Sequence, residues 1–207
     1  MLQLCCCVHF CIVNNDKQKH TTMARLKALN PDEATGKTKE LFSAIQSKLG
    51  VVPNMMSTMG NSSALLEGYL NFSGALAHGK LGAKTGELLA MAVSEKNNCD
   101  YCLSAHTYIG EKLAHIDAAT LTDARNSNNH DAKTAVALQF ATILTAKQGL
   151  VNDADVEAVK AAGFTDGEIG EIVGHVALNV LTNYFNNTAK TDIDFPVVNA
   201  YNSVEAL

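Results

Sequence analysis

The sequence contains no tryptophan, and aromatic residues make up only 6% of its 207 residues. Alanine, leucine and methionine are plentiful instead. These residues favour helices, whereas aromatic residues favour strands. No segment shows the sustained alternation of apolar and polar residues that marks a half-buried strand. These absences predict an all-α fold.

Basic clusters and long apolar runs are also missing. The chain has 16 Lys and Arg residues against 21 Asp and Glu residues, and its net charge of −5 argues against a nucleic-acid partner. No apolar stretch approaches the roughly 20 residues that a membrane-spanning helix needs. No phosphate-binding glycine loop or haem ligand pattern occurs, so no cofactor is expected. We therefore expect a cytoplasmic protein that binds neither nucleic acid nor membrane.

The first 22 residues differ from the rest of the chain. An apolar run up to Val13 carries four cysteines and is followed by a polar stretch up to Thr22. A secretory signal would need a basic start and a small-residue cleavage site, and both are missing. We expect residues 1–22 to be a disordered or spurious extension and residues 23–207 to form one helical domain. A metal-binding or lipidated cysteine cluster is the alternative for this extension.

Apolar residues recur at helical spacing in almost every segment after Met23. The sequence Asn30-Pro31-Asp32-Glu33 resembles a helix start, and Gly50 is a typical helix stop. Asn97-Asn98 separates two further helices. After the first helix, which ends at Gly50, the spacing predicts helices over about residues 63–78, 83–96, 99–114, 117–125, 131–147, 153–162 and 166–188.

Cys99 and Cys102 are the only cysteines after residue 11, and His106 follows four residues later. On a helix, residues i, i+3 and i+7 return to one face, so these side chains share a stripe near the helix N-terminus. Free N–H groups and the positive dipole end there stabilise a thiolate, and a histidine can accept its proton. The spacing therefore predicts a dithiol redox site.

Glu87 lies twelve residues before Cys99, on the preceding predicted helix. If the two helices pack together, its carboxylate can orient His106 or join a proton relay. Glu95 is nearer in sequence, but a solvated carboxylate is expected at its helix end. A zinc site is a weaker alternative, because zinc normally takes four ligands and no second Cys-x-x-Cys or His-x-x-x-His occurs. Buried, inert cysteines are the other alternative.

A polar stripe runs along the last predicted helix: His175, Asn179, Asn183 and either Asn186 or Asn187 recur at helical spacing. Such a stripe can line an active-site pocket or a subunit interface. Buried amides that form hydrogen bonds between helices are nevertheless commoner. Tyr101, which lies between the two cysteines, is a further candidate for shaping the pocket.

Glu87, Cys99, Cys102 and His106 match the signature of the AhpD-like alkylhydroperoxidase, or carboxymuconolactone decarboxylase, superfamily: Glu, eleven residues, Cys-x-x-Cys, three residues, His. The segments 50–54, 183–186 and 192–196 resemble the peroxidase-related branch in particular. The resemblance extends from Met23 to the C-terminus. It implies an AhpD-like helical bundle that assembles as a homo-oligomer, commonly a trimer or hexamer.

The resemblance also implies a function, that of a thiol-dependent peroxidase without a metal or other cofactor. Cys102 attacks a hydroperoxide and becomes a sulfenic acid, Cys99 resolves it as a disulfide, and a dithiol or protein reductant reopens the disulfide. His106 and Glu87 form the proton relay. Tyr101 stands where some peroxidases of the family carry a histidine, a departure that bears on proton transfer. The Cys-x-x-Cys pair argues against lactone decarboxylation.

Two alternatives remain open at this point. A redox sensor or disulfide-exchange protein would use the same cysteines with little turnover. A non-redox enzyme or small-molecule binder would use a pocket of the same fold without the cysteines.

Overall fold

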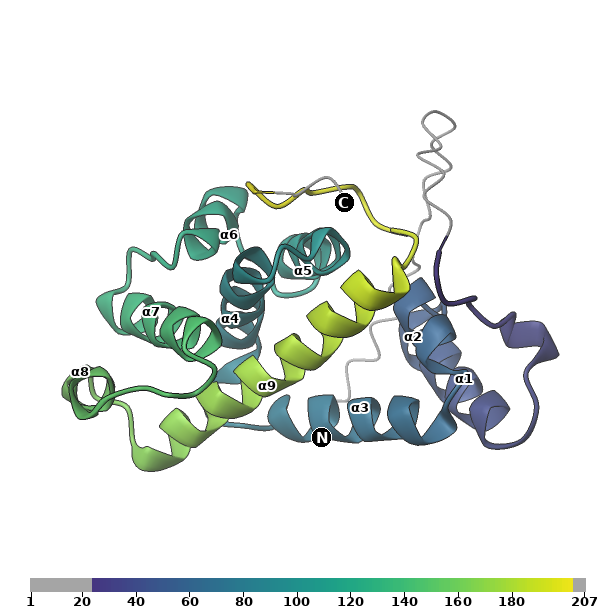
Figure 1. Ribbon diagram of the computed structural model, residues 1–207, viewed down its shortest axis with the longest axis horizontal. Coiled ribbons are helices and arrows are strands. Elements are labelled where there is room, and N and C mark those ends of the chain that lie inside the picture. Colours follow the sequence, from purple (N-terminus) through teal and green to yellow (C-terminus); the bar gives the residue numbers. More distant parts are fainter. Residues whose placement is uncertain (1–23, 203–207) are drawn as a thin grey trace, which may run out of the picture. The chain divides into compact units, whose positions relative to one another are not determined.

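The computed structural model describes residues 24–202, and within them the chain is entirely helical, without any strand. A short 3-10 helix, Pro31–Glu33, precedes nine α-helices (Figure 1). These are α1 (Gly36–Leu49), α2 (Asn54–Met59), α3 (Ser63–Leu76), α4 (Gly82–Lys96), α5 (Asp100–Lys112), α6 (Ala118–Arg125), α7 (Ala132–Ala146), α8 (Asp153–Ala161) and α9 (Asp166–Ala189). The all-α prediction is confirmed.

The expected extension, residues 1–22, lies outside the described residues, and so does Met23. The single domain over residues 23–207 therefore stays a prediction. None of the helices between residues 24 and 202 combines the length and apolar character needed to cross a membrane.

Glycine and asparagine end the helices where the sequence indicated. Gly50 follows α1 with a φ of 80°, a left-handed conformation that glycine adopts without steric cost. Asn97 follows α4, and Asn98 takes a φ of 50°, which separates α4 from α5. Asparagine tolerates this region better than most residues. The turn at Asn97 and Asn98 places the two cysteines at the start of α5.

The predicted start of the first helix is wrong. Asn30 does cap a helical turn, since its side chain accepts a hydrogen bond from the Asp32 N–H, but that turn is the isolated 3-10 helix Pro31–Glu33. Ala34 is buried and extended, with φ −63° and ψ 145°, and α1 begins only at Gly36. Burial of Ala34 therefore interrupts the helix that the sequence pattern predicted.

The described chain forms two compact units, the first comprising residues 24–68 and 189–192. Its interior is made by buried apolar side chains from α1, α2 and the start of α3: Phe42, Ile45, Met55, Met59 and Leu66. The N–H groups of Arg25 and Leu26 both donate to the carbonyl of Ala189, at 2.7 and 3.3 Å. This unit thus joins the beginning of the described chain to the end of α9.

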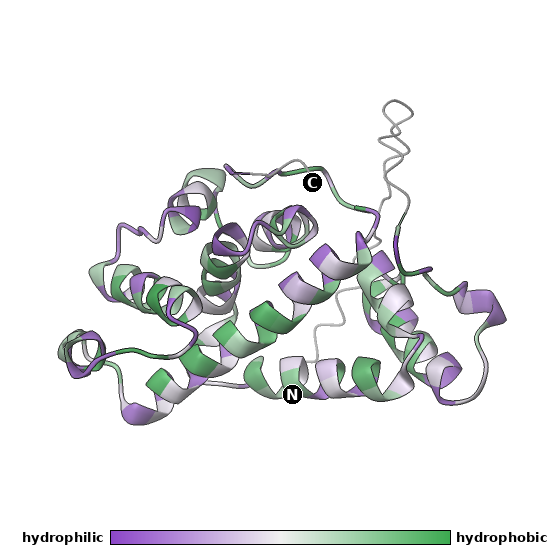
Figure 2. Cartoon of the chain, viewed as in Figure 1, coloured by the Kyte–Doolittle hydropathy of each residue, from purple (hydrophilic) through white to green (hydrophobic). Residues whose placement is uncertain are grey.

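The second unit comprises residues 69–188 and 193–202. Its centre is α4, which packs against α5, α6 and α7. Every residue from Leu88 to Ser94 is buried, and this part of the helix is predominantly hydrophobic (Figure 2). A helix that is apolar all round has neighbours on all sides. Because Glu87 immediately precedes this buried run, the packing of α4 fixes its position relative to α5.

The C-terminal segment, residues 193–202, is held against the start of α5. The Val198 N–H donates to Ser104 Oγ at 2.9 Å, and the Ala200 N–H donates to Asp100 Oδ1 at 2.7 Å. The ring of Phe195 lies 5.8 Å from that of Tyr101 and meets it edge-on. This segment therefore covers the turn that carries the cysteines.

Glu95 is not the solvated carboxylate that its position at a helix end suggested. Its Oε2 accepts from Arg125 Nε at 2.7 Å, and only about a tenth of each side chain is exposed. Its Oε1 accepts the Tyr201 N–H at 2.8 Å, and the Arg125 guanidinium lies 3.8 Å from the centre of the Tyr201 ring. The expectation is wrong because α6 and the C-terminal segment, both distant in sequence, supply its partners.

Two glycines of the first unit provide a matched test of how the interior of that unit is packed. A Cβ at Gly60 would overlap the ring of buried Phe42, whereas a Cβ at Gly68 would meet nothing within 4 Å. We expect Gly60→Ala to lower the free energy of unfolding by about 1–3 kcal/mol through overpacking. Gly68→Ala should raise it by up to about 1 kcal/mol, since alanine favours helices. Urea denaturation of both variants checks this, and equal effects would contradict the described packing.

Candidate functional site

Cys99 and Cys102 form a disulfide at the start of α5, with their Cα atoms 5.3 Å apart. Cys99 is the N-cap residue, with φ −102° and ψ 92°, so it precedes the helix instead of opening its first turn. Its Sγ accepts a hydrogen bond from the Cys102 N–H at 3.3 Å. Cys99 is 0% exposed and Cys102 is 2% exposed. Both sulfurs therefore lie at a helix N-terminus and away from solvent.

The side chains of Glu87 and His106 contact each other across α4 and α5. Glu87 Oε2 lies 2.8 Å from His106 Nδ1, and 20% and 23% of the two side chains are exposed. A carboxylate on Nδ1 orients the imidazole and leaves Nε2 available for proton exchange. The structure thus brings together the two residues whose contact the sequence only suggested.

Glu87 and His106 open onto a cavity of about 160 Å³ in the second unit. Residues from α3, α4, α5 and α9 form its wall, and the two cysteines are not among these lining residues of the described chain. The wall includes Tyr69, Ser73, Leu76, Ala83, Gly86, Ala90, His175, Leu178, Asn179 and Thr182. The cavity therefore combines the carboxylate–imidazole pair with other polar side chains and with apolar ones.

Tyr69 is a residue of this cavity that the sequence did not reveal, because its place among the apolar residues of α3 indicated only packing. Burial and the negative charge of Glu87 raise its pKa to about 12, although a hydrogen bond with Ser73 opposes the shift. The hydroxyl therefore stays protonated at neutral pH. It provides the cavity with a hydrogen-bond donor close to the Glu87 carboxylate.

His175 also lines the cavity, and Gly86 makes room for its ring. A Cβ at Gly86 would come within 3.0 Å of His175 Cε1. Burial lowers the pKa of His175, and the positive form of His106 adds to this effect, while Glu171 and Glu87 oppose it. His175 is therefore a neutral hydrogen-bonding group near pH 7.

The polar stripe on α9 divides between two environments. His175 and Asn179 line the cavity, and Asn179 Nδ2 also donates to the His175 carbonyl at 2.9 Å. Asn183 is fully buried: its Oδ1 accepts from Asn97 Nδ2 at 2.9 Å, and its Nδ2 donates to Ser94 Oγ at 3.2 Å. Its observed contacts are thus those of an amide bridging two helices.

Asn186 and Asn187 continue this stripe toward the cysteines. Asn186 is 3% exposed, and its Nδ2 donates to Cys102 Sγ at 3.4 Å. Asn187 is exposed and donates to the carbonyl of Asn97 at 2.9 Å. Only Asn186 of this pair therefore reaches a sulfur.

Tyr101 is buried beneath the C-terminal segment, against Phe195. It does not belong to the cavity wall formed by the described residues. Its side chain packs the helix start, and an influence on the pocket stays a prediction.

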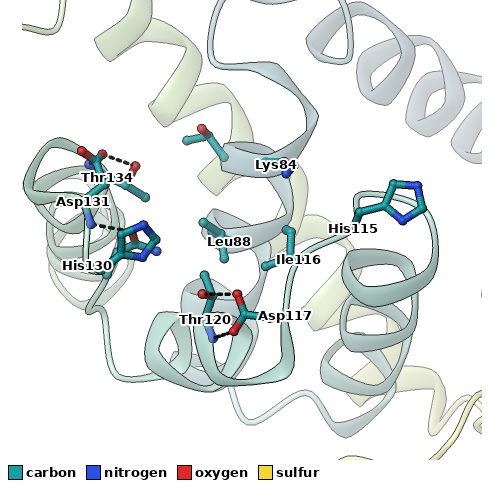
Figure 3. A pocket seen from close by; sticks show the side chains of 11 residues that line it. Lys84, Leu88, His115, Ile116, Asp117, Thr120, His130, Asp131 and Thr134 are labelled. Atoms are coloured by element: carbon teal, nitrogen blue, oxygen red, sulfur yellow. Dashed lines mark hydrogen bonds between the residues drawn. The ribbon is translucent and has the colours of Figure 1, made fainter.

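A larger cavity of about 330 Å³ lies elsewhere in the second unit, beside the starts of α6 and α7 (Figure 3). Asp117 and Asp131 line it, but both carboxylates cap helices by accepting hydrogen bonds from Thr120 and Thr134. These hydrogen bonds also lower the pKa of both aspartates. The reactive residues predicted from the sequence are absent from its described wall, so we place the candidate site at the smaller cavity and the disulfide.

Among residues 24–202, no three His, Cys, Asp or Glu side chains lie close enough together to hold a metal ion. The described site thus consists of a disulfide, a carboxylate–imidazole pair and neutral hydrogen-bonding groups.

Among protein families, the model of the carboxymuconolactone decarboxylase family matches residues 63–114. This region contains Glu87, Cys99, Cys102 and His106. No curated protein has a significantly similar sequence.

Several solved structures share the fold. A peroxidase-related protein from Silicibacter sp. TM1040 is 25% identical with a TM-score of 0.73, covering 84% of this chain and 94% of its own. A peroxidase-related protein with an alkylhydroperoxidase AhpD core, from Ralstonia eutropha JMP134, is 23% identical with a TM-score of 0.74, covering 82% and 92%. The debrominase Bmp8, as a cysteine-to-alanine variant with 2,3,4-tribromopyrrole, is 18% identical with a TM-score of 0.69, covering 86% and 94%. The last two likenesses concern the fold alone.

The lowered pKa of His175 predicts a dependence of stability on pH. Because its pKa in the folded protein lies below the usual 6.5, the unfolded chain binds a proton more readily, and acidification below pH 6.5 favours unfolding. We expect the decrease in unfolding free energy between pH 7 and pH 5 to be smaller in His175→Gln than in the original protein. Urea denaturation at each pH measures it. Near pH 8, where His175 is neutral in both the folded and the unfolded state, the difference in unfolding free energy between the two proteins should no longer change with pH. Plots of unfolding free energy against pH that run parallel down to pH 5 would contradict the assignment.

Proposed function

This chain belongs to the superfamily of carboxymuconolactone decarboxylase and AhpD-like proteins, and from that membership we propose that it is a thiol-dependent peroxidase. Its substrates would be a hydroperoxide and a dithiol or protein reductant. The observation that carries the proposal is the Cys99–Cys102 disulfide at the start of α5, about one helical turn from the Glu87–His106 pair. A disulfide between residues three apart is the oxidised product that such a cycle requires.

The chemistry of the proposed cycle balances. The Cys102 thiolate attacks one oxygen of the hydroperoxide, an S–O bond forms, and the O–O bond breaks. The sulfur is oxidised to a sulfenic acid, and the departing alkoxide takes a proton and leaves as an alcohol. Cys99 then attacks the sulfenic sulfur, which releases water and forms the disulfide. A dithiol reductant transfers two electrons and two protons to reopen it.

Glu87 and His106 are suited to the proton transfers of this cycle. With Nδ1 held by the Glu87 carboxylate at 2.8 Å, His106 Nε2 can take up the thiol proton and return it to the alkoxide. The partial exposure of both side chains on the cavity wall allows exchange with water. We assign this pair the role of proton relay.

The burial of the sulfurs supports a second candidate, a redox sensor or disulfide-exchange protein with little turnover. Because Cys99 is 0% and Cys102 is 2% exposed, a peroxide reaches them only when the surrounding structure opens. A sensor would be oxidised once and would stay oxidised until a partner protein exchanges its thiols with the disulfide. A binder that uses the cavity without the cysteines is the third possibility, since the described wall excludes both of them.

Peroxide consumption with a dithiol donor distinguishes these candidates. We expect the purified protein to consume hydroperoxide over many turnovers, and Cys99→Ser and Cys102→Ser each to abolish it, because the cycle needs both sulfurs. In Cys99→Ser, a trapped sulfenic acid should map to Cys102 by mass spectrometry.

Other outcomes of this experiment identify the alternatives. One round of oxidation without turnover would support the sensor. Full activity in Cys102→Ser would support chemistry independent of the thiols. Thiols that ignore peroxide would contradict the peroxidase, and metal analysis of the purified protein would then test the zinc alternative.

We also propose that the protein assembles as a homo-oligomer, a trimer or hexamer, through α9. Val173, Leu181 and Tyr184 are 45%, 37% and 57% exposed, and their spacing places them on one side of the helix. An exposed apolar stripe of this kind marks a protein–protein contact.

Leu181→Asp tests the assembly. We expect it to lower the molar mass measured by light scattering, because a carboxylate would be buried at the contact without a partner. Far-UV circular dichroism should stay unchanged, since this side chain is exposed in the single chain. Leu150→Asp, on a residue that is 82% exposed and lies outside α9, is the control. Equal masses for all three proteins would contradict the assignment of this face.

A further inference from the structure

The two sulfurs of the disulfide receive hydrogen bonds from different donors. Cys99 Sγ accepts from the backbone N–H of Cys102 at 3.3 Å, as an N-cap residue does. Cys102 Sγ accepts from the side chain of Asn186 on α9, at 3.4 Å. The first sulfur therefore receives its hydrogen bond from the backbone at the helix start, and the second receives one from a side chain distant in the sequence.

The Asn186 side chain also carries an unused acceptor. Asn186 is 3% exposed, and its Oδ1 is buried without a hydrogen-bond partner in the described part of the chain. An unpaired buried carbonyl lowers stability, so native proteins rarely retain one without a reason. Because Oδ1 and Nδ2 belong to one carboxamide, this acceptor lies close to the sulfur that Nδ2 contacts.

We propose that Asn186 is a catalytic residue of the thiol chemistry. One atom of its carboxamide forms a hydrogen bond with the thiolate of Cys102, and another forms one with the sulfenic acid of Cys102. Its Nδ2–H stabilises the Cys102 thiolate, and its Oδ1 accepts the hydrogen bond of the S–OH group that a hydroperoxide forms on that sulfur. The inference rests on the proposed function, of which it specifies one step. No proton changes owner in these contacts, since the amide only donates and accepts hydrogen bonds.

The proposal explains how the second cysteine can be the nucleophile. A thiolate at a helix start gains most from the free backbone N–H groups, and in this chain the contact at 3.3 Å goes to Cys99. A hydrogen bond from Asn186 offsets that advantage at Cys102. The amide thereby makes Cys102 a competent thiolate while leaving Cys99 as the resolving thiol.

Thiol ionisation tests the first role without any enzymatic turnover. In the reduced Cys99→Ser protein, where serine keeps the N-cap, ultraviolet absorbance at increasing pH follows the ionisation of Cys102. We expect Asn186→Leu in this background to decrease the ionisation constant about tenfold or more, which moves the midpoint up by about one pH unit. Asn186→Asp should move it in the same direction, because a carboxylate repels the thiolate.

Two controls separate this role from a structural one. In the reduced Cys102→Ser protein, Asn186→Leu should leave the Cys99 midpoint unchanged, because Cys99 takes its hydrogen bond from the backbone. Asn187→Leu, on the neighbouring amide that donates to the Asn97 carbonyl, should leave the Cys102 midpoint unchanged. Thermal melting establishes that each variant is folded, and Asn186→Asp, closest in shape, is decisive should the leucine variant unfold.

The lifetime of the sulfenic acid tests the second role. After one equivalent of hydrogen peroxide, the Cys99→Ser protein is sampled over time with dimedone. We expect Asn186→Leu to shorten the sulfenic acid lifetime severalfold, whereas Asn186→Asp retains an oxygen acceptor and should preserve most of it. Unchanged midpoints in both folded Asn186 variants, or an equal shift at Cys99, would overturn the proposal.

These results also distinguish the inference from the proposed function. Midpoints that shift as expected in a protein without peroxide turnover would leave Asn186 as the residue that tunes Cys102 and would contradict only the peroxidase. Turnover that survives both Asn186 substitutions would contradict the inference and leave the peroxidase intact.

Discussion

Hydrogen bonds between α9 and the turn that joins α4 to α5 determine where the cysteines lie. Asn183 binds both Asn97 and Ser94, and Asn187 binds the Asn97 carbonyl. The Cys99 N–H in turn donates to the Ser94 carbonyl at 3.0 Å. Each buried polar group left unpaired would cost about 1–3 kcal/mol, so α9 cannot shift along this turn without losing several contacts together. The position of the sulfurs, the reach of Asn186 and the cover over the helix start all depend on this register.

The helix α5 separates two environments that the proposed chemistry must combine. His106 faces a cavity together with Glu87, Tyr69 and His175, while the sulfurs lie among buried side chains. Proton exchange thus has access to water at one point, and the sulfurs are protected from it. Dry surroundings strengthen every hydrogen bond made to a thiolate, because the local dielectric constant is low. The arrangement suits a thiol whose reactions are limited by access to the sulfur.

Much of the fold was predictable from the sequence, because glycines, asparagines and apolar spacing specify helices locally. The contact between Glu87 and His106 was predicted only on the condition that their two helices pack together, and the structure meets that condition. The partners of Asn186 and Glu95 could not be predicted, because they belong to elements distant in the sequence. Residue type alone could not distinguish Asn186, which reaches a sulfur, from Asn187, which is exposed. The early start expected for the first helix failed for the same reason, since burial of Ala34 is a tertiary effect.

The cover provided by the C-terminal segment has a kinetic consequence. Its hydrogen bonds to Ser104, Asp100 and Glu95 hold it against the start of α5, where both sulfurs are buried. Any reagent, whether oxidant or alkylating agent, must then wait for a local opening before it meets a thiol. At low reagent concentration, the rate of thiol modification rises in proportion to that concentration. At high concentration it reaches a ceiling equal to the opening rate, and chemically unrelated reagents share that ceiling. At that ceiling, the opening of the protein and not the concentration of peroxide sets the rate of oxidation.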